Sequence, residues 1–572
     1  MYNPSTNTWE LSDVMTKLQA EKKAGYELQK RKHEDWTDNY ELFRNKVKTN
    51  RLTQRQAVNI PLMKETIKRL LSSIDDRPNV EWSEVGGDEY KELVMQEVWN
   101  DHVQVNNLEL IDILDKKNVL LYGLSTKKLN ISDKGVECSI LDPYDIYIDP
   151  LTNSWDLETA RYIIHNNIFR TVRDILADDR YTKEGKDEIK LWVNTPNGVH
   201  QSEEARKEWE KKMERMKSMG VNHSEFNYFA GGDTIVNLTE HHTKIWNGKE
   251  FEKRVIVYAD DKIELYNETL QDCLGVDFWP FVIWSEDIET QDVYPDSVAD
   301  LVRTPNKVLN VWYSQLIENR TLKNFQMHWV SATGSYTPQT FTPGPGMQLP
   351  APPLSNTGKI SDVIQPVEIS GLDDTLEAIS VLTQIVERGS GVTALQKGET
   401  EKGAQTLGEV EILLGQATER VTAMAKFYRL AWKEYAEKWY ELLSANSPKL
   451  VKLYKQGKSG RMYEKRAMAG DWKSEFGYKA IVSSSSEQEQ SDVKTMQKWL
   501  FVTSKHPNNV ALQKISMKRE LELLDVTPEE LKQVEEAEDQ AQKQQSMQPV
   551  QQPNEEAQLG QQIQQQVAQL NV

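Results

Sequence analysis

GLDDTLEAISVLTQIVERGSGVTALQKGETEKGAQTLGEVEILLGQATERVTAMAKFYRLAWKEYAEKWYELLSAN, residues 371–446, is the stretch that decides the fold. Apolar residues recur at three- and four-residue steps over 371–389, which predicts a helix with one apolar face. Glycines then interrupt the pattern around a polar segment at 390–406. From Leu407 to Leu442 the apolar stripe resumes in nearly heptad steps. This second stripe predicts one helix roughly 60 Å long.

A helix of that length must have its apolar stripe covered along the whole of it, by other helices or by copies of itself. The 572 residues provide for several domains. Only 38% of them are hydrophobic, and the mean hydropathy is −0.66. These values suit an elongated protein, or an oligomer with thin subunits, better than a compact enzyme.

The formal net charge of −19 argues against a protein that coats nucleic-acid phosphates, because coating needs clustered Lys and Arg. It leaves room for local basic loops and for a channel that repels DNA. The two cysteines, Cys138 and Cys273, argue against a disulfide scaffold and fit assembly in a cytosol. The first residues lack a signal-peptide pattern, and no apolar run could span a bilayer, so we expect a soluble protein.

The remaining pattern predicts a mixture of helices and strands, an α+β fold. Helices are expected at 8–48, 62–74, 88–118 and 297–330, the last with a restart or kink at Thr304-Pro305. Strands are expected at 119–150 and as a meander over 234–284, where Asn247-Gly248 is the strongest hairpin signal.

Two further regions change the composition of the chain. Residues 331–370 are rich in proline, glycine and threonine and nearly uncharged, which predicts an irregular insert between two helices. Residues 448–535 are expected to form a helical cap with a hairpin near 476–483. The last residues are acidic and glutamine-rich, with a short helical stripe at Leu559, Ile563, Val567 and Leu570.

Some residues resemble parts of catalytic or metal-binding motifs, but none of them forms a complete motif. Gly457-Lys458-Ser459 resembles the end of a phosphate-binding loop, but position 452 is lysine where that motif needs glycine. His241 and His242 would point to opposite faces of a strand and could not share a metal ion. Asp142, Asp145 and Asp149 lack calcium-loop spacing, and aspartates beside turns usually cap them. We expect no catalytic residue, no metal and no cofactor.

The loop at 392–406 carries Lys397 and Lys402 between glycines. A mildly basic loop between two helices can touch a polyanion without holding it. Composition alone favours an ordinary solvated connection.

The order of the elements resembles the portal proteins of tailed bacteriophages, the head-to-tail connectors, especially the larger type of the short-tailed phages. The resemblance covers roughly residues 55–450 and lies in the order of several stretches, none of which is diagnostic alone. These stretches are NIPLMKETIKRLLSSIDDRPNVEW (59–82), DILDKKNVLLYGLSTKKLN (112–130), LDPYDIYIDPLTNSWDLETARYII (141–164), the proline-phenylalanine strand and helix at 279–330, and GLDDTLEAISVLTQIVERGSGVTALQKGETEKGAQTLGEVE (371–411).

The resemblance implies a portal fold with an α/β wing, a helical stem, a small clip, a long α-helix and a helical crown. Its parts would be 1–295 (wing), 297–330 and 371–389 (stem helices), 331–370 (clip), 390–406 (tunnel loop), 407–447 (long helix), 448–535 (crown) and 536–572 (tail, or a short helical barrel). The implied protein is a dodecameric ring in the virion, at one capsid vertex, assembled in the host bacterial cytoplasm.

The same resemblance implies partners and site residues. Double-stranded DNA would pass through the bore during packaging and ejection, facing Lys397, Lys402, Gln396 and Gln405. Ring contacts would include Leu414, Val421, Met424 and Tyr428. Terminase large subunit, head-tail adaptor and tail proteins, and the major capsid and scaffolding proteins would dock on the ring, with no membrane involved. The terminase would supply ATP hydrolysis, because this sequence has no Walker motif.

Two other functions are also compatible with the sequence. One is an acidic helical scaffold or adaptor that binds partners through its long helix and tail. The other is a hydrolase whose site the sequence does not reveal.

Overall fold

The computed structural model describes residues 2–3, 8–9, 11–46, 58–74, 78–132, 135–193, 203–218, 235–290, 292–325, 328–330, 364–368, 373–390, 407–446, 450–456, 462–475, 477–483 and 505. The chain divides into two compact units, Met1–Ser484 and Ser485–Val572. All elements below belong to the first unit. It mixes helices and strands, so the predicted α+β class is confirmed.

Twelve helices lie in the described residues. They are α1 (Leu11–Phe43), α2 (Leu62–Ser73), α3 (Glu89–Val105), α4 (Leu108–Tyr122), α5 (Val172–Ala177), α6 (Lys183–Val193), α7 (Glu203–Ser218), α8 (Leu270–Leu274), α9 (Val298–Asn324), α10 (Asp373–Ser390), α11 (Leu407–Ala445) and α12 (Ala469–Trp472).

The described strands form short sheets and two larger ones. They are β1 (Tyr2–Asn3), β2 (Thr8–Trp9), β3 (Asn79–Glu84), β4 (Leu124–Ser132), β5 (Gly135–Leu141), β6 (Ile146–Ile148), β7 (Tyr162–Thr171), β8 (Ile235–Trp246), β9 (Phe251–Ala259), β10 (Ile263–Thr269), β11 (Phe281–Ser285), β12 (His328–Val330), β13 (Ile364–Pro366), β14 (Leu450–Gln456), β15 (Met462–Met468) and β16 (Tyr478–Ser483).

The larger sheets are an antiparallel five-stranded sheet, in the order β10-β9-β8-β7-β6, and a three-stranded sheet, in the order β11-β4-β5. The predicted hairpin at Asn247 is confirmed, with Trp246 opposite Phe251. The side chain of Asn247 accepts hydrogen bonds from the backbone N–H groups of Lys249 and Glu250, which fixes the turn. The expected meander ends at β10, because β11 pairs with β4 in the other sheet.

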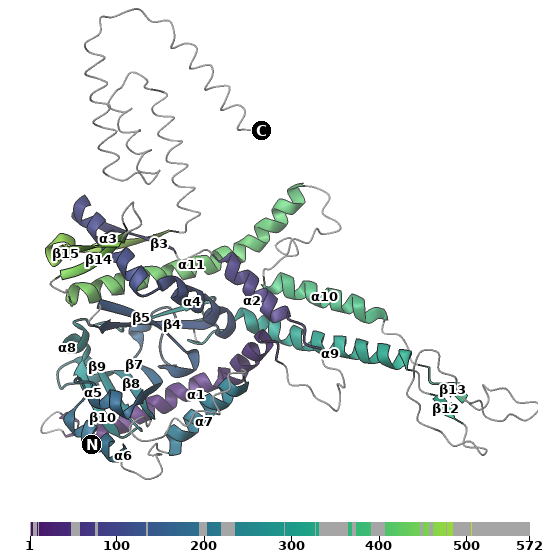
Figure 1. The fold of residues 1–572 in the computed structure, drawn as a ribbon, viewed down its shortest axis with the longest axis horizontal. Coiled ribbons are helices and arrows are strands. Elements are labelled where there is room, and N and C mark those ends of the chain that lie inside the picture. Colours follow the sequence, from purple (N-terminus) through teal and green to yellow (C-terminus); the bar gives the residue numbers. More distant parts are fainter. Residues whose placement is uncertain are drawn as a thin grey trace, which may run out of the picture. The chain divides into compact units, whose positions relative to one another are not determined.

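Helix α1 runs beside the five-stranded sheet (Figure 1). Gln29 on α1 donates to the carbonyls of Pro143 and Ile146, and Lys22 forms an ion pair with Asp261. A Cβ on Gly25 would lie 2.8 Å from the Cβ of Tyr147, so only glycine permits this close approach of the helix to β6.

The predicted helix at 88–118 is in fact two helices, α3 and α4. Asn107 takes a left-handed conformation with φ of 48° and interrupts the helix. Asparagine tolerates this conformation better than most residues. The apolar stripe continues across the break, which is why periodicity alone did not reveal it.

The region after α11 also differs from the prediction. Residues 450–483 form β14, β15, α12 and β16 rather than a helical cap. The hairpin expected near 476–483 is absent from the described residues, since β16 pairs with β3 and Tyr478 lies opposite Glu84. The other crown and tail residues, Lys505 excepted, and the segment Gly457-Lys458-Ser459 lie outside the described residues. Among the helices described, none combines the length and apolar character that crossing a membrane requires.

A glycine pair tests the packing between α4 and the start of α9. Gly123 has φ of +82°, and a Cβ there would lie 2.2 Å from the carbonyl oxygen of Pro295. Gly87 has nearly the same backbone, φ of +79°, with nothing within 4 Å. We expect Gly123→Ala to lower the free energy of unfolding by about 3 kcal/mol or more, and Gly87→Ala by about 1 kcal/mol. Equal losses in urea denaturation would contradict the close approach.

Candidate functional site: the α9–α10 pair and the seat of α11

Helix α9 begins with a capping box. The Ser297 hydroxyl accepts from the N–H of Asp300, and the Asp300 carboxylate accepts from the N–H of Ser297. The helix continues through Pro305, so the predicted restart at Thr304-Pro305 is wrong. A proline inside a helix removes one hydrogen bond, and the surrounding contacts hold α9 continuous here.

Those contacts form a polar ladder that the sequence analysis missed. Three buried side chains of α9, spaced four residues apart, accept from backbone N–H groups at the start of α2 and just before it. The pairs are Asn306 with Met63 (2.8 Å), Asn310 with Ile60 (2.8 Å) and Ser314 with Val58 (3.1 Å). The spacing of these polar residues on an otherwise apolar face is the signal that could have revealed them.

Beyond Ser314, α9 has no buried residue in its described length, and α10 packs against it (Figure 1). Ile379 and Val386 of α10 are buried, as the predicted stripe requires. Leu376, Val381 and Ile385 remain 58%, 51% and 56% exposed. Helix α9 therefore covers only part of the apolar surface of α10. We call Val381 and Ile385, which lie one turn apart on the same face, the α10 patch.

The chain between α9 and α10 starts and finishes as a strand pair. In β12 and β13, His328 lies opposite Pro366 and Val330 opposite Ile364. Two helices thus lead into an antiparallel pair that encloses the insert predicted at 331–370. Residues 331–363 themselves lie outside the described residues.

The second half of α11 rests on two buried lysines from α4 and β4. Lys116 lies 2.6 Å from Asp112 and 4.9 Å from the ring centroid of Tyr428, whose hydroxyl donates to the same carboxylate. Lys127 pairs with Asp115 and lies 5.1 Å from the ring of Trp432.

Further along α11, His102 Nε2 lies 2.8 Å from the Tyr435 hydroxyl. The ammonium of Lys438 donates to the carbonyls of Phe281 (2.8 Å) and Trp279 (3.1 Å). We call these contacts, from Tyr428 to Lys438, the α11 seat.

The α11 seat fixes both the rotation and the position of this helix. A shift by one turn would separate the Tyr428 hydroxyl from Asp112 and the buried ammonium of Lys438 from the carbonyls of Phe281 and Trp279, which costs several kcal/mol. Burial raises the pKa of Asp112 to about 6, with Lys116 opposing the shift. The N-terminal end of α11 leads directly to the segment 391–406, so the seat determines where the helix delivers that segment.

The predicted site residues fall into three groups. Met424 and Tyr428 were expected between copies of the chain; their side chains are instead 2% and 0% exposed within the protomer's own core, where no neighbour can reach them. Leu414 and Val421 lie on α11, but their side chains are outside the described set. Lys397, Lys402, Gln396 and Gln405 lie outside the described residues altogether.

The histidine pair and two of the three aspartates behave as predicted. His241 lies 2.9 Å from Glu21 of α1, whereas His242 lies 2.7 Å from Glu240, so the two rings occupy opposite faces of β8. Asp142 caps the short turn at Tyr144, and Asp149 accepts from Arg161. Within the described part of the chain, no three His, Cys, Asp or Glu side chains converge as a metal ion would require.

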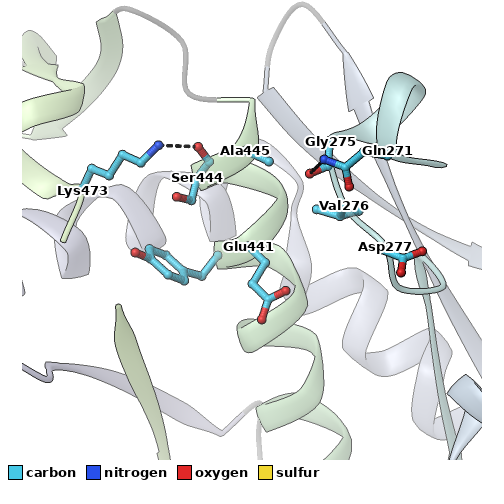
Figure 2. Close-up of a pocket in the computed structure, with 9 residues that line it drawn as sticks. Gln271, Gly275, Val276, Asp277, Glu441, Ser444, Ala445 and Lys473 are labelled. Carbon is cyan, nitrogen blue, oxygen red and sulfur yellow. Dashed lines mark hydrogen bonds between the residues drawn. The ribbon is translucent and has the colours of Figure 1, made fainter. Parts of the chain in front are cut away.

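An open pocket of 370 Å³ lies where the C-terminal ends of α8 and α11 meet (Figure 2). Lys473 reaches across it and donates to the carbonyl of Ser444 (3.0 Å), and Gln271 donates to that of Gly275. Burial and Glu437 raise the pKa of Glu441 at its wall. The side chains of Lys473 and Gln271 thus hydrogen-bond to the carbonyl groups at the two helix ends.

Comparisons with known proteins point to one family. A family model described as the phage SU10 portal protein matches residues 35–571, nearly the whole chain. Among solved structures, a similar chain belongs to a structure described as the neck of an empty GTA particle computed with C6 symmetry. It is 9% identical with a TM-score of 0.34, and the match covers 72% of this chain and 81% of that one. A likeness of that size supports no inference. No curated protein matches the sequence.

The α11 seat predicts a measurable difference between two tyrosines. Tyr428→Phe removes the hydroxyl that donates to buried Asp112, and we expect it to lower the free energy of unfolding by about 1–3 kcal/mol. Tyr90, which is 63% exposed on α3, is the matched control. Tyr90→Phe should change stability by less than about 0.5 kcal/mol. If chemical denaturation gives the same value for both variants, the hydroxyl at Tyr428 contributes nothing to the seat.

Proposed function

This chain belongs to the phage SU10 portal protein family, and from that membership we propose that it assembles into a closed dodecameric ring whose bore carries double-stranded DNA into and out of the capsid. The portal identity places the protein in the virion, at a capsid vertex. The ring number, the DNA-facing residues and the docking partners are the parts that we propose.

The single observation that carries the proposal is the α10 patch. Val381 and Ile385 are more than half exposed on a helix that buries Ile379 and Val386. Apolar surface of this kind is favourable to cover, and in a ring the next copy covers it. A ring needs two different surfaces on each subunit that meet and close. We place the α10 patch, together with Leu414 and Val421 of α11, in that interface.

The segment 390–406 is proposed as the tunnel loop, with Lys397, Lys402, Gln396 and Gln405 facing DNA. Its ends are held by α10 and by α11, and α11 is in turn fixed by its buried seat. Two lysines per copy would give a positive belt in a protein of net charge −19. Exposed contacts of this kind are weak and screened by salt, so they hold the duplex without trapping it.

The insert between β12 and β13 is proposed as the clip, which docks the terminase large subunit during packaging and head-tail adaptor or tail proteins afterwards. The supporting observation is that two packed helices lead into a strand pair enclosing an uncharged, proline-rich segment. Contacts with the major capsid and scaffolding proteins would lie on other surfaces of the ring. Assembly would take place in the host bacterial cytoplasm.

The portal family is structural, and we propose that this chain has no catalytic activity of its own. The energy for DNA movement would then come from the ATPase of the docked terminase. The protein would contribute a channel of fixed shape and an acidic surface that DNA can pass.

The interface proposal predicts the effect of charges in the α10 patch. Val381→Asp with Ile385→Asp places two carboxylates where apolar contact is proposed, which costs several kcal/mol per contact if they are buried. We expect native mass spectrometry to show mainly monomers with unchanged circular dichroism.

The control for this experiment is Leu151→Asp, a leucine that is 72% exposed in a turn distant in sequence from α10. It should leave the rings intact. Rings from the α10 variant at normal yield would exclude the patch from the interface.

The tunnel-loop proposal predicts a defect in DNA handling without a defect in assembly. Lys397→Ala with Lys402→Ala removes the two positive charges, so rings should form normally while packaged DNA, or its retention in filled heads, decreases. The measurement is the amount of encapsidated DNA that remains after nuclease treatment. The control is Lys505→Ala, which removes one positive charge outside the loop. Normal packaging and retention of full-length genomes would reduce the loop to a connector.

A further inference from the structure

In helix α7, three positively charged side chains between Glu210 and Lys217 contact the rest of the protein. The side chains of α7 from Glu210 to Lys217, the part whose exposure the structure describes, include no buried residue. Helices in globular proteins usually gain their stability by burying an apolar face. What holds α7 beside α1 (Figure 1) must therefore be sought in its polar contacts.

Three cations of α7 make those contacts. Lys212 donates to Asp145 and lies 5.2 Å from the ring centroid of Phe169. The guanidinium carbon of Arg215 lies only 3.7 Å from the ring centroid of Tyr144.

The remaining contacts follow the same pattern. Arg215 lies 3.8 Å from Asp142. Lys211 lies 5.5 Å from the ring of Tyr26 and 3.4 Å from its hydroxyl. Each cation thus meets an aromatic face, and two of the three also meet a carboxylate.

The receiving side is a defined surface made of Tyr26, Asp142, Tyr144, Asp145 and Phe169, which we call the acidic–aromatic surface. Its members are held by contacts that do not involve α7. Tyr144 is 3% exposed, and its hydroxyl lies 3.0 Å from that of Thr37. Asp145 accepts from Asn167 (2.8 Å), and Asp142 accepts from the N–H of Tyr144 (3.1 Å). The surface would keep its shape if α7 left it.

We propose that the acidic–aromatic surface is a docking site for a Lys- and Arg-rich helical segment of a partner protein, and that α7 occupies this site as an intramolecular competitor. Charge complementarity supports the choice of partner, because the surface presents two carboxylates and three aromatic faces to cations at positions i, i+1 and i+4. Since contacts of this kind hold the described part of α7, a helix with the same spacing of cations can replace it. The acidic–aromatic surface lies on other elements than the α10 patch, so the docking does not depend on ring formation.

The free energies involved are small enough for exchange. The Arg215–Asp142 pair is partly exposed, so it contributes little, and single cation–π contacts are also weak. Salt screens the exposed pair, with a Debye length of about 8 Å at physiological ionic strength, and reaches the buried carboxylate of Asp145 less. The covalent link of α7 to the chain raises its effective concentration at the surface, so a free helix competes poorly until the contacts of α7 are weakened.

Acid should weaken the contacts of α7 through His33. Burial, followed by Arg215, Lys211 and Lys30, lowers the pKa of His33 to about 4, with Asp142 opposing the shift. Two of these cations belong to α7. Protonated His33 therefore repels the docked helix, and docking becomes less favourable as pH falls towards 4.

Burial and the neighbouring Asp142 raise the pKa of Asp145, and Lys212 and Asn167 oppose the rise. Departure of α7 would remove Lys212 and also admit water to this carboxyl, and these two changes move its pKa in opposite directions. The expected weakening of docking in acid therefore rests on His33.

The test uses the full-length chain and a fluorescent synthetic peptide with the sequence of residues 203–218. In the opened variant, Lys211→Glu, Lys212→Glu and Arg215→Glu turn the cis contacts repulsive. We expect the peptide to bind this variant about tenfold or more tightly than wild type in fluorescence anisotropy at low salt. Binding should disappear at about 0.5 M salt.

Two matched controls define the site. A peptide with Gln at the positions of Lys211, Lys212 and Arg215 should not bind the opened variant. Adding Asp142→Asn and Asp145→Asn to that variant should abolish binding of the original peptide. Equal peptide binding by wild type and the opened variant, or binding that ignores the two aspartates, would overturn the proposal.

Hydrogen exchange on the wild-type protein keeps the test valid if the opened variant fails to fold. Raising salt, or lowering pH towards 4 with intrinsic exchange rates corrected for, should deprotect the amides of α7 while those of α1 stay protected. If the amides of α7 and α1 stay equally protected under all these conditions, α7 does not leave the surface and the proposal is wrong. Ring formation, measured on the same samples, tests the portal function independently of the docking of α7.

Discussion

The contact on which the structure depends most is the meeting of two buried lysines with the aromatic face of α11. Lys116 and Lys127 are almost inaccessible to water, and each has a buried aspartate on one side and a ring of α11 nearby. Such groups are stable only when every partner is in place. The seat therefore favours one rotation and one position of α11. A less specific apolar contact would define the position of the long helix less sharply.

The same chemistry gives the opposite behaviour at α7, because there it is partly exposed to water. Arg215 and Lys212 meet carboxylates and aromatic rings as Lys116 and Lys127 do, but no described residue of α7 is buried. Solvent and salt weaken the former contacts and hardly reach the latter. Burial thus distinguishes α11, which is fixed in place, from α7, which we propose a partner helix can replace.

Much of the fold was predictable because it rests on local patterns. Apolar periodicity located α10 and α11 to within two residues, and Asn247-Gly248 located the β8–β9 hairpin. The failures are long-range. The pairing of β16 with β3 joins Tyr478 to Glu84, 394 residues apart, and no local pattern encodes it. The polar contacts of the α11 seat were not predicted, because Tyr428 and Tyr435 fit the apolar stripe of the helix. The same reading led us to place Met424 and Tyr428 between copies, where the protomer's own core covers them.

Electron microscopy of the purified protein tests the central claim most directly. The account predicts closed rings with a central hole. In a reconstructed subunit, α11 should lie in its seat while the α10 patch contacts the next copy. Monomers at high concentration, or open filaments without closure, would contradict the account, because the exposed α10 patch would then need a different occupant.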